Sequence, residues 1–200
     1  VNAADGPVHE KQELSKASIE VNSPEWTRYD AVLTPVATTG TAEFVITAPD
    51  GGDVAFGFMS LMPSDTFMNH GLRKDLVMKL QEMKPAFLRF PGGCIVEGFT
   101  PETAMLFRKT VGPVWERPSH WLLWHYRTTN GLGFHEYLQL CEDLNLQALY
   151  VCNCGMTCQG RGPYYFNGNE MEDLIQDTLD ALEYAMGPAD SKWGSLRARM

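Results

Sequence analysis

The hydrophobic pattern of the chain changes its period at Pro63, and this change most constrains the fold. Beyond Pro63, apolar side chains recur at helical spacing from Leu72 to Met83, until Pro85 ends the pattern. A short apolar run over 86–90 follows and is typical of a buried strand. The pattern therefore predicts a helix followed directly by a strand.

The alternation of helix and strand continues along the rest of the chain. The further predicted elements are a helix from Thr100 as N-cap to about Lys109, a helix over 134–141, a strand over 147–153 and a helix over 171–185. Such alternation predicts an α/β fold with a parallel sheet, either open or closed as a (β/α)₈ TIM barrel. A closed barrel needs roughly 250 residues, so residues 63–200 would form only its N-terminal part.

Residues 1–62 have a different pattern, with strand-like alternation and few helical periods. Apolar side chains alternate over 41–48 and again over 54–58, on either side of the turn-forming segment 49–52. This predicts a hairpin with one apolar face, which must be buried against another sheet. We therefore expect 1–62 to be the C-terminal part of a β-sandwich module of the jelly-roll, carbohydrate-binding type.

The charge of the chain limits its partners. Lysine and arginine number 16 against 25 aspartates and glutamates, which gives a net charge of −9. Such an acidic surface repels phosphate backbones and anionic lipid, and no apolar run approaches the roughly 20 residues of a membrane span. We expect neither a nucleic acid nor a membrane partner.

The start and the cysteines of the chain bear on its context. The first residues lack an initiator methionine and the pattern of a signal peptide, and we interpret the chain as an interior fragment of a longer protein. Five cysteines are an odd number and do not suggest a disulfide framework. The disulfide state of Cys152, Cys154 and Cys158 stays open at this stage.

Polar residues at strand ends are the first candidates for a site, because the C-terminal ends of parallel strands line the active sites of α/β folds. Arg89 lies inside the apolar strand and must find a carboxylate or several carbonyl groups. Gly92 and Gly93 follow and allow a tight turn that exposes backbone N–H groups. The alternatives are a structural buried ion pair for Arg89 and a plain turn for the glycines.

The second strand end carries a C-x-C-x₃-C sequence at Cys152, Cys154 and Cys158. Its spacing differs from zinc sites, and no histidine lies nearby in the sequence. We therefore expect no metal site and no cofactor, and interpret Cys152 and Cys154 as small buried side chains on one strand face. Asn153 faces the other way and could reach a ligand.

Aromatic residues are concentrated between 115 and 137. Together with nearby histidine and arginine they suit a groove that stacks on sugar rings, with Trp124 as one candidate. Phe134 and Tyr137 are better explained as core residues of a helix.

An Asn169-Glu170 pair invites an acid/base interpretation. Asn169 directly precedes the amphipathic segment 170–186, with Glu172 three residues later, and we interpret the pair as a helix cap.

Several motifs occur in the order found in one enzyme family. They are SLMPSDTF at 60–67, GLRKDL at 71–76, KPAFLRFPGGCIVEG at 84–98, 111–113 with 117–118, YRTTNGLGFHEY at 126–137, 183–185 and WGSLRA at 193–198. This sequence resembles glycoside hydrolase family 51, the α-L-arabinofuranosidases, over about 26–200. The resemblance implies a sandwich module leading back to a (β/α)₈ barrel, which hydrolyses terminal α-L-arabinofuranosyl linkages with retention through two carboxylates.

The resemblance also implies roles for individual residues. Arg89 matches the arginine that orients the nucleophile, and Cys94 matches a position that touches the sugar in the −1 subsite. The acid/base and nucleophile glutamates are expected beyond Met200, and the fragment alone is expected to be inactive. The full set of candidate binding residues is Gly93, Cys94, Glu97, Trp124 and Asn153. His125 departs from the family pattern, where a glycine is common, and Cys154 and Cys158 lie in a variable loop.

The resemblance sets the expected substrate as an arabinose-containing polysaccharide or oligosaccharide of the arabinan or arabinoxylan type. An extracellular or periplasmic location is favoured for the parent protein, and an oligomer is possible. Two alternatives remain, a non-catalytic carbohydrate-binding module based on residues 1–60 and Trp26, and another retaining barrel glycosidase such as an endo-glucanase.

Overall fold

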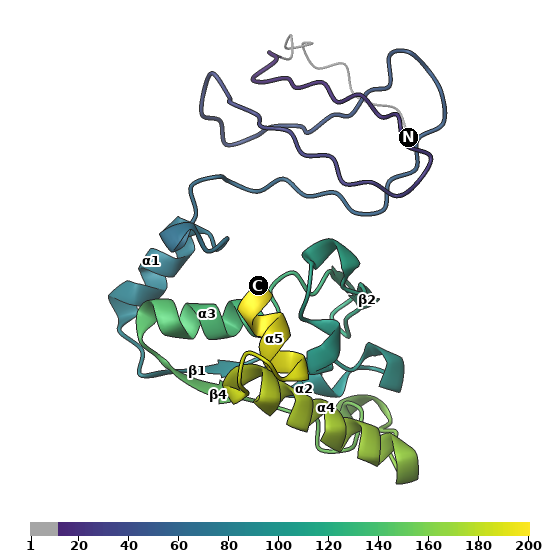
Figure 1. Cartoon of the computed structure of the whole chain (residues 1–200), viewed down its shortest axis with the longest axis vertical. Helices are drawn as coiled ribbons and strands as arrows, with labels where there is room; N and C mark the ends of the chain where they lie inside the picture. Colours follow the sequence, from purple (N-terminus) through teal and green to yellow (C-terminus); the bar gives the residue numbers. More distant parts are fainter. Residues whose placement is uncertain (1–11) are drawn as a thin grey trace. The chain divides into compact units, whose positions relative to one another are not determined.

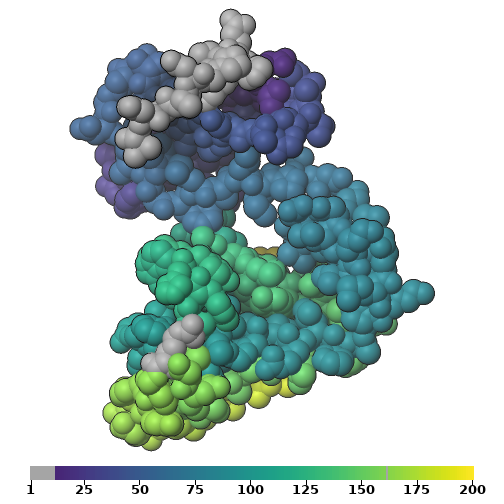
Figure 2. Space-filling model, turned by 180° about the vertical axis from the view of Figure 1, so that it is seen from behind, coloured from purple at the N-terminus to yellow at the C-terminus, as the bar shows by residue number. Residues whose placement is uncertain are grey.

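The computed structural model describes residues 12–200 and divides the chain into two compact units, Val1–Met59 and Ser60–Met200. Figure 1 shows the course of the chain, and Figure 2 shows its atoms in a space-filling view from behind. The two units are described separately below. The domain types predicted for the two parts of the sequence stay predictions.

The described part of the first unit, residues 12–59, contains neither helix nor strand. The turn predicted after 41–48 is present, because the Gly51 N–H donates to the Ala48 carbonyl oxygen at 3.2 Å. The predicted hairpin strands are wrong, since 41–48 and 54–58 form no ladder. The apolar side chains that were predicted to lie on a buried face, such as Phe44 and Phe56, are more than half exposed. Without a second sheet over that face, hairpin pairing gains little from burial.

The second unit is built on a parallel pair of strands. β1 (Phe87–Phe90) pairs with β4 (Gln147–Tyr150) in register along the whole length of both. α3 (Phe134–Leu144) lies on the connection between them (Figure 1). Parallel neighbours need such a crossover, because a tight turn can join only antiparallel strands. The predicted α/β class is confirmed, while closure into a barrel stays a prediction.

Three further helices accompany this pair. α1 (Lys74–Met83) and α4 (Gly168–Met186) confirm predicted helices, whereas α5 (Lys192–Arg199) was not predicted. α1 ends where Lys84 takes a left-handed conformation, φ 50°, just before a proline. No helix within residues 12–200 combines the length and apolar character that a membrane crossing requires.

Short elements fill the loops. They are η1 (Phe67–Asn69), α2 (Gly93–Glu97), η2 (Pro101–Thr103), η3 (Phe107–Lys109), η4 (Val114–Glu116), β2 (His120–Trp121), β3 (Arg127–Thr128) and η5 (Gln159–Arg161). β2 and β3 pair in antiparallel fashion.

The single helix predicted from Thr100 to Lys109 is wrong. The segment forms η2 and η3, separated by Ala104 in an extended conformation with ψ 132°. A buried carboxylate starts the second turn, because Asp177 on α4 accepts hydrogen bonds from the N–H groups of Phe107 and Arg108, at 2.8 and 3.2 Å. These tertiary hydrogen bonds replace the ones that a continuous helix would have made.

A capped helix start is present at α4, as predicted, but the predicted cap residue, Asn169, is wrong. The N-cap is Asn167, and Asn169 lies inside the first helical turn. The Glu170 carboxylate accepts from the Asn167 N–H at 3.3 Å and from the Tyr164 hydroxyl at 2.8 Å. The Glu170 carboxylate therefore stabilises the start of α4. It does not pair with Asn169, as an acid/base role would need.

Aromatic rings dominate the core of the second unit. Phe90, Phe107, Phe134 and Tyr184 are each at most 5% exposed, and the Phe107 ring meets both the Phe134 and the Tyr184 ring edge to face. Tyr137 stacks on Phe90 with ring centroids 4.8 Å apart. The expectation that Phe134 and Tyr137 belong to the core is confirmed.

The strand pair buries only one of its faces. Along β1 the side chains of Leu88 and Phe90 point to the core, while those of Phe87 and Arg89 are exposed. Leu149, opposite Arg89 on β4, is 50% exposed. The face that carries Arg89 is therefore uncovered by the described residues of this unit.

Candidate functional site

The C-terminal ends of β1 and β4 meet at one edge and bring two loops together. The Val151 N–H donates to the Phe90 carbonyl oxygen at 2.7 Å, which extends the pairing past both strands. After β1 the chain turns at Gly92, whose φ of +117° favours glycine. α2 begins at the exposed Gly93, so the glycine pair forms the turn that the sequence predicted.

Among the described residues, Arg89 lacks the buried partner that its position in an apolar strand predicts. Arg89 is exposed, and its side chain makes no hydrogen bond or ion pair to the parts of the chain that the structure describes. The expectation of an internal carboxylate or carbonyl partner is wrong for this chain, because the strand buries only its other face. Five guanidinium N–H donors are thus available on the uncovered face of the sheet.

Asn153 holds the second loop against the first. Its side-chain amide donates to the Val96 carbonyl oxygen at 3.2 Å, and its Oδ1 accepts from the N–H groups of Gly155 and Met156 at 2.8 and 3.1 Å. Both polar atoms of the side chain are engaged within the protein. The structure therefore gives Asn153 a loop-fixing contact near the strand ends.

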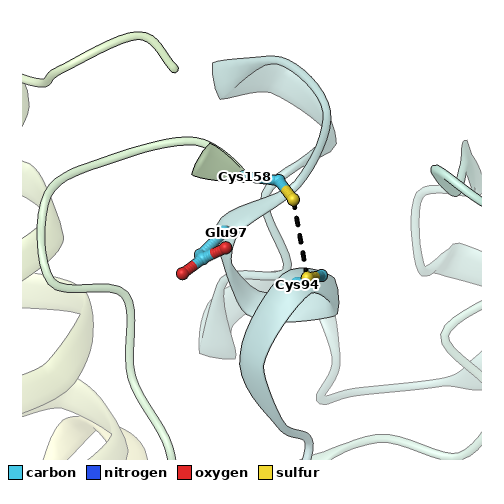
Figure 3. Close-up of side chains that lie close together, drawn as sticks. All are labelled: Cys94, Glu97 and Cys158. Atoms are coloured by element: carbon cyan, nitrogen blue, oxygen red, sulfur yellow. Dashed lines mark hydrogen bonds between the residues drawn. The ribbon is translucent and has the colours of Figure 1, made fainter. Parts of the chain in front are cut away.

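Cys94, Glu97 and Cys158 lie together where the two loops meet (Figure 3). Cys94 and Glu97 are three residues apart on α2 and so share one face of that turn. The thiols of Cys94 and Cys158 are hydrogen-bonded to each other, with the two Sγ atoms 3.5 Å apart. This separation is far longer than the roughly 2.05 Å of a disulfide bond.

The surroundings of this cluster are partly buried. The side-chain hydrogen bond shared with Cys158 raises the pKa of the Cys94 thiol, as do burial and the nearby charges of Cys158 and Glu97. The Oε2 atom of Glu97 is buried and has no hydrogen-bond partner among the described residues. A buried carboxylate oxygen in that state is costly unless a ligand satisfies it.

The sequence motif C-x-C-x₃-C does not form one cluster. Cys152 and Cys154 are exposed in the loop after β4, which makes their interpretation as buried strand residues wrong. Cys158 is 3% exposed and packs beside Cys94, 64 residues earlier in the chain. No local pattern signals that pairing, although the rule that strand ends meet at one edge predicts the approach of the two loops.

The β2–β3 hairpin presents the aromatic residues that the sequence singled out. The rings of Trp124 and Tyr126 stack with centroids 6.5 Å apart and 22° between their planes, and both side chains are about half exposed. The Arg127 guanidinium lies 5.8 Å from the ring centre of Trp121. His125, at the tip, has a φ of +66°, a conformation in which glycine is less strained.

The comparison with family sequences decides the assignment. The sequence model of the alpha-L-arabinofuranosidase 1 domain matches residues 79–200, which include both strands and both loops of the candidate site. The chain belongs to the family 51 α-L-arabinofuranosidases.

Individual relatives agree with this membership. The chain is 37% identical to alpha-L-arabinofuranosidase 1 of Arabidopsis thaliana, over 88% of this chain and 26% of the relative. It is also 37% identical to an extracellular exo-alpha-L-arabinofuranosidase of Streptomyces chartreusis, over 88% of this chain and 22% of that protein. The chain thus spans about a quarter of the length of these relatives.

A solved structure of the family supports the fold. An arabinose-bound MgGH51 α-L-arabinofuranosidase superposes with a TM-score of 0.62 and 37% identity, over 67% of this chain and 21% of that one. In this chain, the candidate residues Arg89, Gly93, Cys94, Glu97 and Asn153 lie on the two parallel strands or in the loops that follow them, and Trp124 lies on the hairpin between the strands.

Proposed function

We propose that the full-length protein is a retaining, exo-acting α-L-arabinofuranosidase that removes terminal arabinofuranosyl groups from arabinan- or arabinoxylan-type polysaccharides and oligosaccharides. The observation that carries this proposal is the position of Arg89 beside the converging ends of β1 and β4. Its side chain is exposed on the uncovered sheet face and has no partner within residues 12–200. An extracellular or periplasmic location fits such a substrate.

Arg89 is proposed to orient the nucleophile. A planar guanidinium donates two parallel hydrogen bonds to a carboxylate and keeps it ionised. The donors of Arg89 are not engaged by the described residues, so they are available for a carboxylate from another barrel strand. Arg89 acts through the nucleophile and is a positioning residue.

The loop after β1 is proposed to border the sugar in the −1 subsite, with Gly93, Cys94 and Glu97 as contact residues. Asn153 supports this loop from the other strand through its hydrogen bond to Val96. Its direct contribution to sugar binding is proposed to be secondary to this support.

Trp124 is proposed to bind the remainder of the substrate beyond the cleaved bond. Its ring stacks with Tyr126, and both rings keep about half of their surface exposed. Sugars stack on such surfaces through their apolar C–H faces, so a stacked pair offers a wide platform.

The two carboxylates of the retaining mechanism are proposed to lie outside these 200 residues. Retention needs a pair roughly 5–5.5 Å apart. Glu170, the acidic residue that invited an acid/base interpretation, is engaged with Tyr164 and the start of α4. The chain matches only 26% of the length of such a relative, which leaves room for both carboxylates elsewhere in the full-length protein.

The proposal is tested with the full-length protein on an aryl α-L-arabinofuranoside, with aryl β-glucoside as the control substrate. We expect release of the aryl group from the arabinofuranoside only, and proton NMR should show that arabinose first appears with its α configuration. Cleavage of the glucoside alone, or inversion at the anomeric carbon, would overturn the proposal. Binding of arabinoxylan without any hydrolysis would instead indicate a carbohydrate-binding module.

A further inference from the structure

The cluster of Cys94, Glu97 and Cys158 places two sulfur atoms and one carboxylate oxygen within 4.8 Å of one another, with Glu97 to one side of the sulfur pair (Figure 3). We propose that these three side chains form a binding site for a thiophilic divalent cation, with Zn²⁺ as the reference ion. The site is distinct from the C-x-C-x₃-C motif, of which it uses only Cys158.

The distances fit such a cation. Zinc binds cysteine sulfur at about 2.3 Å, so two sulfurs 3.5 Å apart can share one zinc ion with an S–Zn–S angle of about 100°. An ideal tetrahedral site would separate the sulfurs by about 3.8 Å. The ligand atoms of all three residues already lie within 4.8 Å of one another.

The donor set selects the class of ion. Two sulfurs with one carboxylate suit zinc, cadmium or cobalt, whereas calcium and magnesium require oxygen ligands. Three protein ligands leave a fourth tetrahedral position, which a water molecule fills in open zinc sites.

The backbone around the cluster is fixed before any ion binds. The Cys158 N–H donates to the Gly98 carbonyl oxygen at 2.9 Å, and the Gly98 N–H donates to the Cys94 carbonyl oxygen at 2.9 Å. Gly98 has a φ of +74°, and a Cβ there would lie 2.5 Å from the Ala104 backbone nitrogen. This close packing holds Cys94 and Cys158 at their present separation.

One oxygen of the partly buried Glu97 carboxylate is an independent indication of a ligand. This atom, Oε2, is inaccessible to solvent and lacks a hydrogen-bond partner among the described residues. A cation beside the two sulfurs would compensate this charge, which neither thiol does.

Occupation of the site has a consequence for catalysis, and this part rests on the proposed function. If Cys94 borders the −1 subsite, a cation held by its sulfur competes with the sugar. We therefore infer that zinc inhibits the full-length enzyme by raising KM for the arabinofuranoside.

Binding is tested on the 200-residue chain by titration with Zn²⁺ against a chromophoric chelator. Co²⁺ then reports the ligands, through a thiolate-to-cobalt charge-transfer band and the intense visible bands of tetrahedral coordination. We expect one ion per chain. Cys94→Ser and Cys158→Ser should each weaken binding by more than about tenfold, since even the loss of groups that only support ligands costs about 10–100-fold.

Cys152→Ser and Cys154→Ser are matched controls, because both residues are exposed cysteines of the same loop. Glu97→Gln keeps both sulfurs and should retain the charge-transfer band with weaker affinity, which tests the site without altering the sulfur pair. No binding by the folded wild-type chain, or equal binding by the Cys94→Ser variant, would overturn the site. Binding to the chain without inhibition of the full-length enzyme would overturn only the catalytic consequence, and the proposed function would stand.

Discussion

Arg117 and Glu136 form a two-pronged ion pair, with Nη2–Oε1 and Nη1–Oε2 distances of 2.8 and 2.9 Å. The Arg117 side chain is 1% exposed and also donates to the carbonyl oxygens of Gly112 and Asn130. One guanidinium thus ties the loop before the aromatic hairpin, the loop after it and the first turn of α3 together. No local sequence pattern indicates this pair, because its members lie 19 residues apart in separate motifs.

Arg117→Ala should therefore strongly destabilise the second unit. Removing one partner of a buried pair leaves the other charge uncompensated, which costs about 3–5 kcal/mol. Arg117→Lys should restore only part of the loss, since a lysine cannot reproduce the planar fork. Urea unfolding of the 200-residue chain, followed by tryptophan fluorescence, measures the difference.

Arg127→Ala is the matched control for Arg117. Arg127 is exposed, bonds to Ser119 and lies over a tryptophan ring. Its removal should cost no more than about 1 kcal/mol. Equal losses for the two variants would contradict the assignment of Arg117 as the central contact.

Gly133→Ala should be among the most damaging single-methyl additions. A Cβ at this position would lie 2.0 Å from the Thr110 carbonyl oxygen and 2.9 Å from Nη1 of Arg117. The backbone must shift to admit it, and overpacking of this kind typically costs about 1–3 kcal/mol. Gly160→Ala meets nothing within 4 Å and should leave the melting temperature unchanged; a similar fall for both would refute the steric argument.

The parts of the fold that were predicted from sequence are those whose signal is local. α3 and α4 carry apolar side chains at helical spacing, and β1 is a short apolar run between breakers, so neighbouring residues suffice to define them. The segment from Thr100 to Lys109 fails because Asp177, about 70 residues away, captures its N–H groups. The strands predicted over 41–58 fail because their pairing depends on a covering sheet.

Acidification should weaken the folded state through His135. Burial lowers its pKa from 6.5, with Glu136 raising it and Arg117 lowering it further. The unfolded chain then binds a proton more readily than the folded chain, so stability is fully present above pH 6.5 and is lost as the pH falls through 6.5. Burial also lowers the pKa of His120, so His120 contributes to the pH dependence in the same direction.

Unfolding free energies at pH 8.0 and 5.5 measure this effect. His135→Gln should flatten the decline, whereas His125→Asn, at the exposed hairpin tip, should leave it as in the wild type. Asp177 affects the pH dependence of stability in the opposite direction, because burial raises its pKa above 3.8. This contribution is the same in the wild type and in both histidine variants, so their comparison removes it. A wild-type chain that gains stability on acidification would contradict the prediction.

In the candidate site, too, only the features with a local sequence signal could be predicted. The strand-end rule located Arg89, Gly93 and Asn153 on or beside the loops that do converge, because the rule depends only on parallel pairing. The exposure of Arg89 and the contact between Cys94 and Cys158 could not be predicted, since both depend on which surfaces the rest of the chain covers. A sequence pattern indicates on which face of a strand or helix a side chain lies, but not which other residues cover that face.

Arg89→Ala separates a positioning role from a structural one. Within the 200-residue chain, Arg89 is exposed and makes no hydrogen bond to a described residue, so the substitution should change the unfolding free energy by no more than about 0.5 kcal/mol. In the full-length enzyme, loss of a preorganised contact to the nucleophile should lower kcat by about 10²–10³ and leave KM within several-fold, because Arg89 does not hold the sugar. Arg89→Lys should recover only part of kcat, since its ammonium lacks the planar fork. A large fall in melting temperature with nearly normal kcat would instead identify Arg89 as a structural residue of the barrel wall.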